Sequence, residues 1–247
     1  MRTANPALND RAFRDASLGS FEERMTIEGT VNKTGLLLIC AIVTAAWTWH
    51  LYMQSRDVAA VGPLTLVGAL GGLVFAFVTI FKKTWAPITA PVYALLEGLV
   101  LGGVSAMFEV RFPGIAIQAV SLTFGTLVVL LLVYRAHLIP VTQNFRLGVV
   151  AATGGIFFVY VITMILGFFG IHIGSSIYGA GLVGIGFSIF VVIIAALNLV
   201  LDFDFIERGA QSGAPKYMEW YGAFGLMVTL IWLYFEILRL LAKSRQR

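Results

Sequence analysis

Seven long apolar runs constrain the fold of this chain more than any other feature of its sequence. Each is long enough to cross the hydrocarbon core of a bilayer as a helix, which takes about twenty residues. The connections between the runs are short. We therefore expect an all-α polytopic membrane protein, a single compact bundle of seven transmembrane helices. The runs cover roughly residues 36–54, 60–81, 86–108, 115–136, 147–171, 180–205 and 218–241.

The composition of the chain excludes several other classes of protein. Hydrophobic residues make up 59% of it and charged residues only 12%, whereas soluble domains carry about 25% charged residues. A transmembrane barrel would need short alternating strands, and the runs here are continuous. The net charge of +4 comes from basic residues in the loops, where orientation in the bilayer explains them. The bilayer is thus the expected partner, and nucleic acid is not.

The distribution of basic residues predicts how the chain is oriented. We expect residues 1–34 to form a cytosolic N-terminal tail and residues 35–247 to form the seven-helix membrane domain. Basic residues in the tail and in alternate connections place the N-terminus in the cytosol by the positive-inside rule. They are Arg2, Arg11, Arg14, Arg24, Lys33, Lys82, Lys83, Arg135, Arg146, Arg208 and Lys216.

The basic residues after the seventh run do not fit this orientation. Arg239, Lys243, Arg245 and Arg247 would lie on the opposite side if the last helix crosses the membrane. A re-entrant last helix would return them to the cytosol. The length of the run favours a full crossing.

Small residues recur at a spacing of four in three of the runs. The pairs are Gly68 and Gly72, Gly98 and Gly102, and Gly184 and Ser188. This pattern lets helix backbones approach closely in a membrane. It predicts helix–helix contacts and no chemistry.

The sequence contains no catalytic motif of a soluble enzyme. It lacks HExxH, a Walker pattern and a GxSxG elbow, which would mark a zinc, nucleotide or nucleophile site. It also lacks the GxGD pattern and the buried Ser/His pair of intramembrane proteases. His50, His137 and His172 fall at the ends of different runs, and Cys40 is the single cysteine. We expect no enzyme activity, no cofactor and no certain metal site.

An acidic cluster closes the sixth run. Asp202, Asp204, Glu207 and Arg208 lie within seven residues. A carboxylate at the end of a membrane helix costs a few kcal/mol unless it is wet, paired or protonated. Asp202 and Asp204 point about 200° apart on a helix and cannot face the same neighbour. Asn198, one turn before Asp202 on the same stripe, could hydrogen-bond it, which makes Asp202 the inward-facing candidate and puts Asp204 near headgroups or loop water.

Two further acidic residues lie inside the apolar runs. Glu97 sits in mid-span without a basic residue within two turns. It is either a protonated carboxyl bonded to a neighbouring helix or a residue that lines an aqueous path. Glu236 has Arg239 three residues later, which favours an ion pair on one helix face.

Asp202 could act as a switch for a cation path. An ionised carboxylate can bind a hard cation such as Ca²⁺ through oxygen. A protonated one can close the gap as a hydrogen-bond donor. Asp202 is therefore a candidate pH sensor and a candidate calcium contact, although a structural helix-end cap facing water would use the same residue.

Several stretches of the chain resemble a known family. They are LNLVLDFDFIERG at the end of the sixth run, APKYMEWYGAFGLMVTLIWLYFEILRLL after it, and NPALNDRAFRD with MTIEGTVNKTGLLL near the start. Together they resemble bacterial proteins of the Bax inhibitor-1 superfamily (the transmembrane Bax inhibitor motif proteins). The likeness covers most of the chain and is strongest over residues 87–110 and 185–241. It implies a seven-helix bundle with the last helix central, and a pH-sensitive calcium leak channel gated by two facing aspartates on the sixth and seventh helices.

The resemblance assigns these two positions residue by residue. The sixth-helix pattern Asp-Thr-Gln-x-Ile matches residues 202–206, so Asp202 takes the first sensor position. The seventh-helix pattern matches residues 223–229 without gaps and puts Thr229 where the second aspartate is expected. A looser match would choose Glu236. Asp204 or Glu236 could compensate for the missing aspartate, and the family's arginine on the second helix has no clear counterpart, because Lys82 and Lys83 lie at the helix end.

Three functions follow as hypotheses. The first is a cation leak, with Ca²⁺ as the permeant ion and Asp202 as the sensor. The second is a non-conducting regulatory protein that docks other membrane proteins. The third, an intramembrane enzyme, would require Glu97 and Asp202 to face one another across a wet cavity. The resemblance implies a bacterial cytoplasmic membrane as the location.

Overall fold

Seven helices make up most of the part of the chain that the structure describes. The structure is a computed structural model and describes residues 24–170 and 179–246. Within these ranges, seven helices are long and apolar enough to cross a membrane, as the apolar runs predict. They are α2 (Ile27–Ser55), α3 (Val58–Phe81), α4 (Ala86–Arg111), α5 (Ile115–Arg135), α6 (Gln143–Phe168), α8 (Leu182–Gln211) and α9 (Met218–Arg245), with a short 3₁₀ turn, η1 (Lys83–Trp85), before α4.

The first helix begins earlier than its apolar run. Residues 27–34, expected in the tail, belong to α2, and Thr26 is its N-cap. Of the remaining expected tail, residues 24–26 are described and residues 1–23 lie outside the described residues. Thr26 caps the helix by accepting from the Gly29 amide at 2.9 Å. Thr30 and Thr34 each donate to the carbonyl four residues earlier at 2.9 Å. Hydropathy misses this turn because its polar side chains are satisfied by the helix itself.

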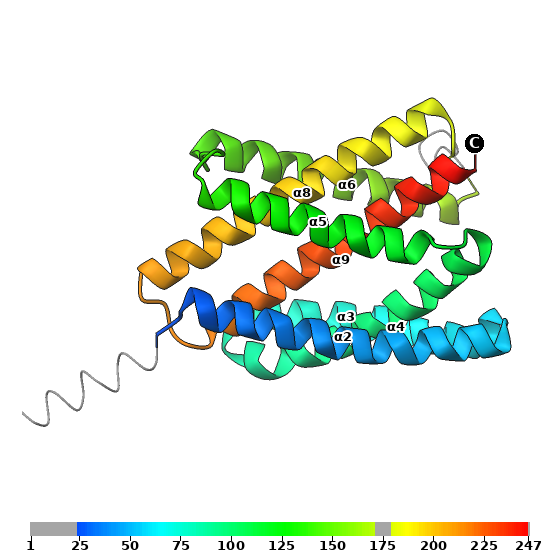
Figure 1. Cartoon of the computed structure of the whole chain (residues 1–247), viewed down its shortest axis with the longest axis horizontal. Coiled ribbons are helices and arrows are strands. Elements are labelled where there is room, and N and C mark those ends of the chain that lie inside the picture. Colours follow the sequence, from blue (N-terminus) through cyan, green and yellow to red (C-terminus); the bar gives the residue numbers. More distant parts are fainter. Residues whose placement is uncertain (1–23, 171–178, 247) are drawn as a thin grey trace, which may run out of the picture.

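The last helix lies in the middle of the bundle. α9 runs diagonally between a group formed by α2, α3 and α4 and a group formed by α5, α6 and α8 (Figure 1). In its most apolar stretch 61% of the residues are buried, against 11% to 39% in the other six. α9 packs against α2, α4, α5 and α8. This confirms the expected seven-helix bundle, and the last helix is central in it.

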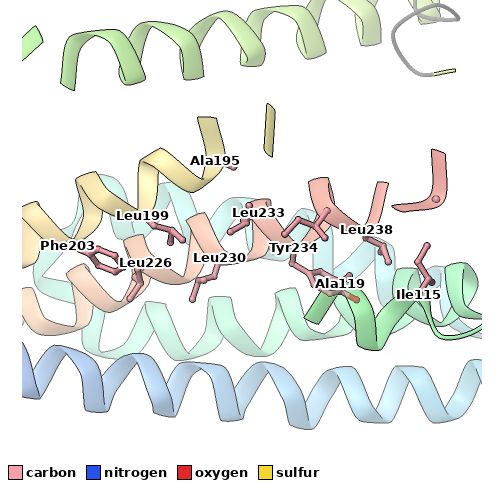
Figure 2. Packing of buried hydrophobic residues seen from close by; sticks show 12 residues of the cluster. Ile115, Ala119, Ala195, Leu199, Phe203, Leu226, Leu230, Leu233, Tyr234 and Leu238 are labelled. Carbon is pink, nitrogen blue, oxygen red and sulfur yellow. The ribbon is translucent and has the colours of Figure 1, made fainter. Parts of the chain in front are cut away.

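The main hydrophobic cluster is built on α9. Leu226, Leu230, Leu233 and Leu238 of α9 meet α8 on one side and α5 on the other (Figure 2). Lipid tails are as apolar as leucine, so moving a leucine from lipid into the bundle gains little free energy unless the side chains pack closely. Shape complementarity around α9 therefore holds the two groups of helices together.

The small-residue pairs lie at helix contacts. A Cβ on Gly98 or Gly102 of α4 would come within 2.3 Å or 2.0 Å of carbonyl oxygens of α2. A Cβ on Gly68 of α3 would come within 2.5 Å of a carbonyl oxygen of α4. Gly184 and Ser188 lie where α8 meets α9. The predicted helix–helix contacts are thus present at these positions.

The basic connections gather at one end of the bundle. The Met25 amide donates to the Ala214 carbonyl at 2.7 Å, so the start of α2 meets the α8–α9 connection. Lys83, between α3 and α4, lies over the Tyr221 ring at 5.3 Å. Arg146, after the α5–α6 connection, lies 3.2 Å from Asp204 near the end of α8. The basic residues of the alternate connections therefore also lie together in space, at one end of the bundle.

α9 reaches the other end of the bundle. It is one continuous helix of 28 residues, about 42 Å long at 1.5 Å per residue. Near its C-terminus Arg245 donates to the Pro113 carbonyl and to Gln118 at 2.8 Å each, at the connection between α4 and α5. This geometry supports a full crossing over a re-entrant helix.

We expect Gly102→Ala to destabilise the bundle more than Gly154→Ala. The new methyl group at residue 102 would overlap the α2 backbone, whereas nothing lies within 4 Å of a Cβ at Gly154. Overpacking of this kind costs about 1–3 kcal/mol. Thermal unfolding of the purified variants in detergent measures the difference. Equal unfolding temperatures for the two variants would contradict the close α2–α4 contact.

Candidate functional site

Two acidic residues from different helices line one cavity inside the bundle. The cavity has a volume of about 610 Å³ and lies between α3, α4, α8 and α9. Glu97 of α4 and Asp202 of α8 both line it. They are 105 residues apart in the chain, and the helix packing around α9 brings them to the same space.

Asp202 carries the least satisfied polar atom of the site. Its Oδ2 is buried and has no hydrogen-bond partner among the described residues. The Thr229 hydroxyl of α9 acts on the same carboxyl as a hydrogen-bonding group. A buried oxygen without a partner costs about 1–3 kcal/mol or more when charged. The carboxyl is therefore poised to take a proton, a cation or another donor.

Thr229 has two acceptors for a single proton. Its Oγ1 lies 3.3 Å from the Gly225 carbonyl one turn earlier and also faces Asp202. A hydroxyl donates one hydrogen bond and accepts two. When Asp202 is ionised the hydroxyl is drawn to it. When Asp202 is protonated, the carboxyl can donate to Thr229, which is then free to keep its bond to Gly225.

Glu97 lies on the α3–α4 side of the cavity. Its carboxyl rests over Gly72, where a Cβ would come within 2.8 Å of Oε1. Tyr93, one turn earlier on α4, lines the same cavity. Glu97 thus lines the cavity, and the absent side chain of Gly72 makes the room for its carboxyl.

One side of the cavity is open toward the outside of the bundle. α3 packs on α4 and α8 packs on α9, and α3 and α8 make no extended contact. Val228 is the one large apolar residue of α9 that is exposed, at 37%. Leu73 of α3 and Phe205 of α8, which also line the cavity, are 54% and 40% exposed. The central helix is therefore reached from the side between α3 and α8, where lipid would lie.

The prediction that Asn198 hydrogen-bonds Asp202 is wrong. Asn198 donates to Thr153 of α6 at 2.8 Å and to the Ile194 carbonyl at 2.8 Å. α6 covers that face of α8, so the amide is satisfied there. Asp202 lines the cavity all the same, but its neighbour is Thr229 of α9.

Asp204 faces a different helix from Asp202, as their spacing predicts. Arg146 of α6 lies 3.2 Å from its Oδ2, and Arg208 pairs with it one turn later on α8. Its side chain is 14% exposed. Asp204 is a paired carboxylate near the helix end, and in this arrangement it does not replace the missing aspartate opposite Asp202.

Glu236 is also engaged away from Asp202. Arg239 lies 2.9 Å from it, which confirms the expected ion pair. Tyr160 of α6 donates to Glu236 at 2.9 Å and accepts from Arg239 at 2.9 Å. Glu236 is 2% exposed, whereas the side chain of Arg239 is 38% exposed. Of the two residues considered opposite Asp202, Thr229 is the one that the structure brings to it.

Lys83 contacts a residue that lines the cavity. Its Nζ lies over the ring of Tyr221, and Tyr221 lines the cavity. Lys82, the C-cap of α3, is its neighbour. Neither lysine lines the cavity itself, in keeping with the absence of an arginine counterpart on this helix.

Sequence reasoning missed a buried acidic residue at the start of α9. Glu219 is fully buried and pairs with Lys33 and, at 2.9 Å, with Lys216. It also accepts from the amide and the hydroxyl of Thr26 at 2.9 Å each. A Cβ on Gly29 would fall 2.3 Å from Glu219 Oε1.

This cluster ties the start of α2 to the start of α9. It lies beside Tyr221 and Gly222, which line the cavity, so it fixes one wall of the site. The signal in the sequence was a glutamate within one turn of Lys216 and at the start of a helix. Its long-range partner Lys33 could not be identified without the fold.

The cavity offers fewer oxygen ligands than a tightly held Ca²⁺ ion needs. Ca²⁺ takes six to eight oxygen ligands, and the cavity offers two carboxylates and the nearby hydroxyls of Tyr93 and Thr229. Within residues 24–170 and 179–246, no three His, Cys, Asp or Glu residues are grouped to hold a metal ion. Glu97 and Asp202 share this cavity, and Tyr93 and Tyr221 also line it.

We expect Glu219→Gln to destabilise the protein by about 2 kcal/mol, because the fully buried side chain loses the charge with which it pairs with Lys33 and Lys216. Glu28→Gln is the matched control, since Glu28 is an exposed residue in the first turn of α2. Unfolding by heat or denaturant in detergent measures both. A variant at residue 219 as stable as the one at residue 28 would contradict the role of the cluster.

Comparison with known proteins agrees with the fold and with the matched motifs. A comparison with curated proteins finds no match. The family model described as Bax inhibitor 1 like matches residues 5–246. The match includes all seven membrane helices and the stretches around Asp202 and Thr229. A match over nearly the whole chain shows the family, and the protein therefore belongs to the Bax inhibitor-1 family of multi-pass membrane proteins.

Proposed function

We propose that this protein is a cation leak pathway, with Ca²⁺ as the permeant ion, and that protonation of Asp202 modulates it. The observation that carries the proposal is that Asp202 and Glu97 line one cavity within the membrane-spanning part of the bundle. Ionisable residues inside a membrane are costly, and they mark ion and proton paths. Family membership supports the same reading.

The depth of Asp202 fits a gate. It lies nine residues before the end of α8 at Gln211, or about 13 Å along the helix axis. Tyr221, near the start of α9, lines the cavity together with the two carboxyls, so all three are available to a cation that enters from this end. Ligands that are few and shared with water hold the ion weakly, and weak binding is what conduction needs.

Thr229 gives the gate a form that differs from a pair of aspartates. An ionised Asp202 draws the Thr229 hydroxyl and offers Oδ2 to a cation. A protonated Asp202 donates to Thr229 and removes the charge from the path. A single titrating group therefore provides the switch, with Glu97 as the second carboxyl of the path.

Membership of the family also supports a proposal for the membrane that holds the protein and for its orientation there. We propose a bacterial cytoplasmic membrane with the N-terminus in the cytosol. The end of the bundle that carries Arg24, Lys33, Lys83 and Arg146 would then face the cytosol, in line with the positive-inside rule. The charges at the end of α9 remain the exception, and Lys243 and Arg245 are held there by hydrogen bonds to α8 and to the α4–α5 connection.

A regulatory protein that docks other membrane proteins is the alternative. The exposed apolar residues on the outer helices are accounted for by lipid contact, so they do not favour docking. Crosslinking in native membranes followed by pulldown distinguishes the two functions, because a docking protein returns a stoichiometric membrane-protein partner and a channel need not.

We expect the wild-type protein in proteoliposomes to pass Ca²⁺ faster as the pH rises, because Asp202 loses its proton. Asp202→Asn resembles the protonated state and should give low flux with little response to pH. A calcium dye trapped in the vesicles measures the flux. Asp57→Asn is the control, since Asp57 caps α3 at an exposed loop.

Glu97→Gln is measured in parallel because Glu97 is the other carboxyl on the cavity. A response to pH that survives in Asp202→Asn but vanishes in Glu97→Gln would move the sensor to Glu97. Equal flux and equal response to pH in the wild type and Asp202→Asn would refute the sensor role of Asp202.

A further inference from the structure

The lining of the acidic cavity has two chemical parts. One part consists of the carboxyls of Asp202 and Glu97. The rest is mostly apolar, and several of its side chains are exposed at the outer surface of the bundle, including Leu73, Phe205 and Val228. A path for hydrated ions alone needs no apolar opening toward lipid. The combination fits a ligand that has one charged end and one apolar end.

The sign of the charged end follows from the polar groups of the cavity. Asp202 Oδ2 is buried without a hydrogen-bond partner among the described residues, and Glu97 is the second carboxyl. Both groups accept hydrogen bonds when ionised. A donor with positive charge satisfies them, whereas a fatty acid would bring a third carboxylate. Lys83 contacts the ring of Tyr221 and does not line the cavity, so the lining itself supplies no cation.

The size and the opening of the cavity agree with a single-chain ligand. Its volume of about 610 Å³ lies within the range of roughly 300–1,000 Å³ typical of small-molecule sites. The side between α3 and α8 would give access from the bilayer, where an amphiphile is already concentrated. A second cavity, of about 330 Å³ between α2, α4, α5 and α9, has no carboxylate in its lining. Its polar groups Ser105 and Tyr234 bond to each other at 2.6 Å.

We propose that the acidic cavity binds a lipophilic ammonium ion, a long-chain amine, that enters from the bilayer between α3 and α8. The ammonium group binds Asp202 and Glu97, and the alkyl chain extends past Val228 and Leu73 toward lipid. The proposal names a ligand class for the same cavity as the proposed function. It requires binding and does not require conduction.

Photolabelling of the full-length protein in proteoliposomes tests this site. The probe is dodecylamine that carries a diazirine, and the comparator is the matching dodecanol. We expect the amine to label the faces of α3, α8 and α9 around Val228, in competition with unlabelled dodecylamine. The alcohol should not prefer this cavity. The double variant Asp202→Asn with Glu97→Gln should lose labelling about tenfold, as expected for the loss of a charged hydrogen bond.

A second variant keeps both carboxyls and blocks the opening. Leu73→Trp places a large side chain at the exposed mouth of the cavity and should reduce labelling by the amine. Leu66→Trp is the matched control, because Leu66 is 60% exposed on the same helix and does not line the cavity. This pair remains informative if the double variant fails to fold.

The outcomes separate this proposal from the leak function. Equal labelling of the cavity by amine and alcohol, or full labelling in Leu73→Trp, would overturn the ammonium site. Specific labelling in a protein that passes no Ca²⁺ would support the site and refute the leak. Ca²⁺ flux in a protein that the amine does not label would support the leak and refute the site.

Discussion

The burial of α9 among the other helices is the constraint on which the rest of the structure depends. A helix in that position must have each of its polar side chains satisfied by a neighbour, because neither water nor lipid can do so. Glu219 is paired with Lys33 of α2, Glu236 accepts a hydrogen bond from Tyr160 of α6, and Tyr234 shares a hydrogen bond with Ser105 of α4. These contacts fix the rotation of α9 and its position along the bundle axis. Removing one partner is costly even where the pair itself adds little net stability.

The acidic cavity is where this rule is relaxed. Thr229 of α9 meets Asp202 of α8, and one oxygen of that carboxyl has no partner within the described residues. Val228, the residue before Thr229, is exposed at the side of the bundle. A buried polar atom without a partner, beside an exposed residue of an otherwise buried helix, favours a binding site over a purely structural contact. The Glu219 cluster lies ten residues before Thr229 on α9, about 15 Å along the helix axis.

Much of the architecture could be predicted from the sequence, because lipid imposes simple rules. Run length identified the seven helices, and small residues identified contacts between them. The resemblance identified the family and selected Thr229 opposite Asp202. The start of α2 was misplaced because its threonines bond to the helix backbone, which a hydropathy measure does not register.

The candidate site could be predicted only in part. Helix periodicity predicted correctly that Asp202 and Asp204 face different neighbours, because both lie on one helix and its geometry sets the angle between them. It assigned Asn198 to Asp202 wrongly, because the partner of a side chain depends on which helix covers that face, here α6. The shared cavity of Glu97 and Asp202 and the pair of Lys33 and Glu219 join segments far apart in the chain. Only the packing of the bundle brings them together.

A cavity lined by the carboxyls of Asp202 and Glu97 lies against the middle of α9, and the side between α3 and α8 opens it to the outside of the bundle. The rate of thiol modification at Val228→Cys, in a chain whose one native cysteine is removed by Cys40→Ser, tests this arrangement. We expect a cationic reagent to react faster than an anionic one of similar size. We also expect Asp202→Asn with Glu97→Gln to abolish this preference. Equal rates for both reagents in the chain with native carboxyls, or no reaction with either, would show that no open cavity with negative charge reaches α9.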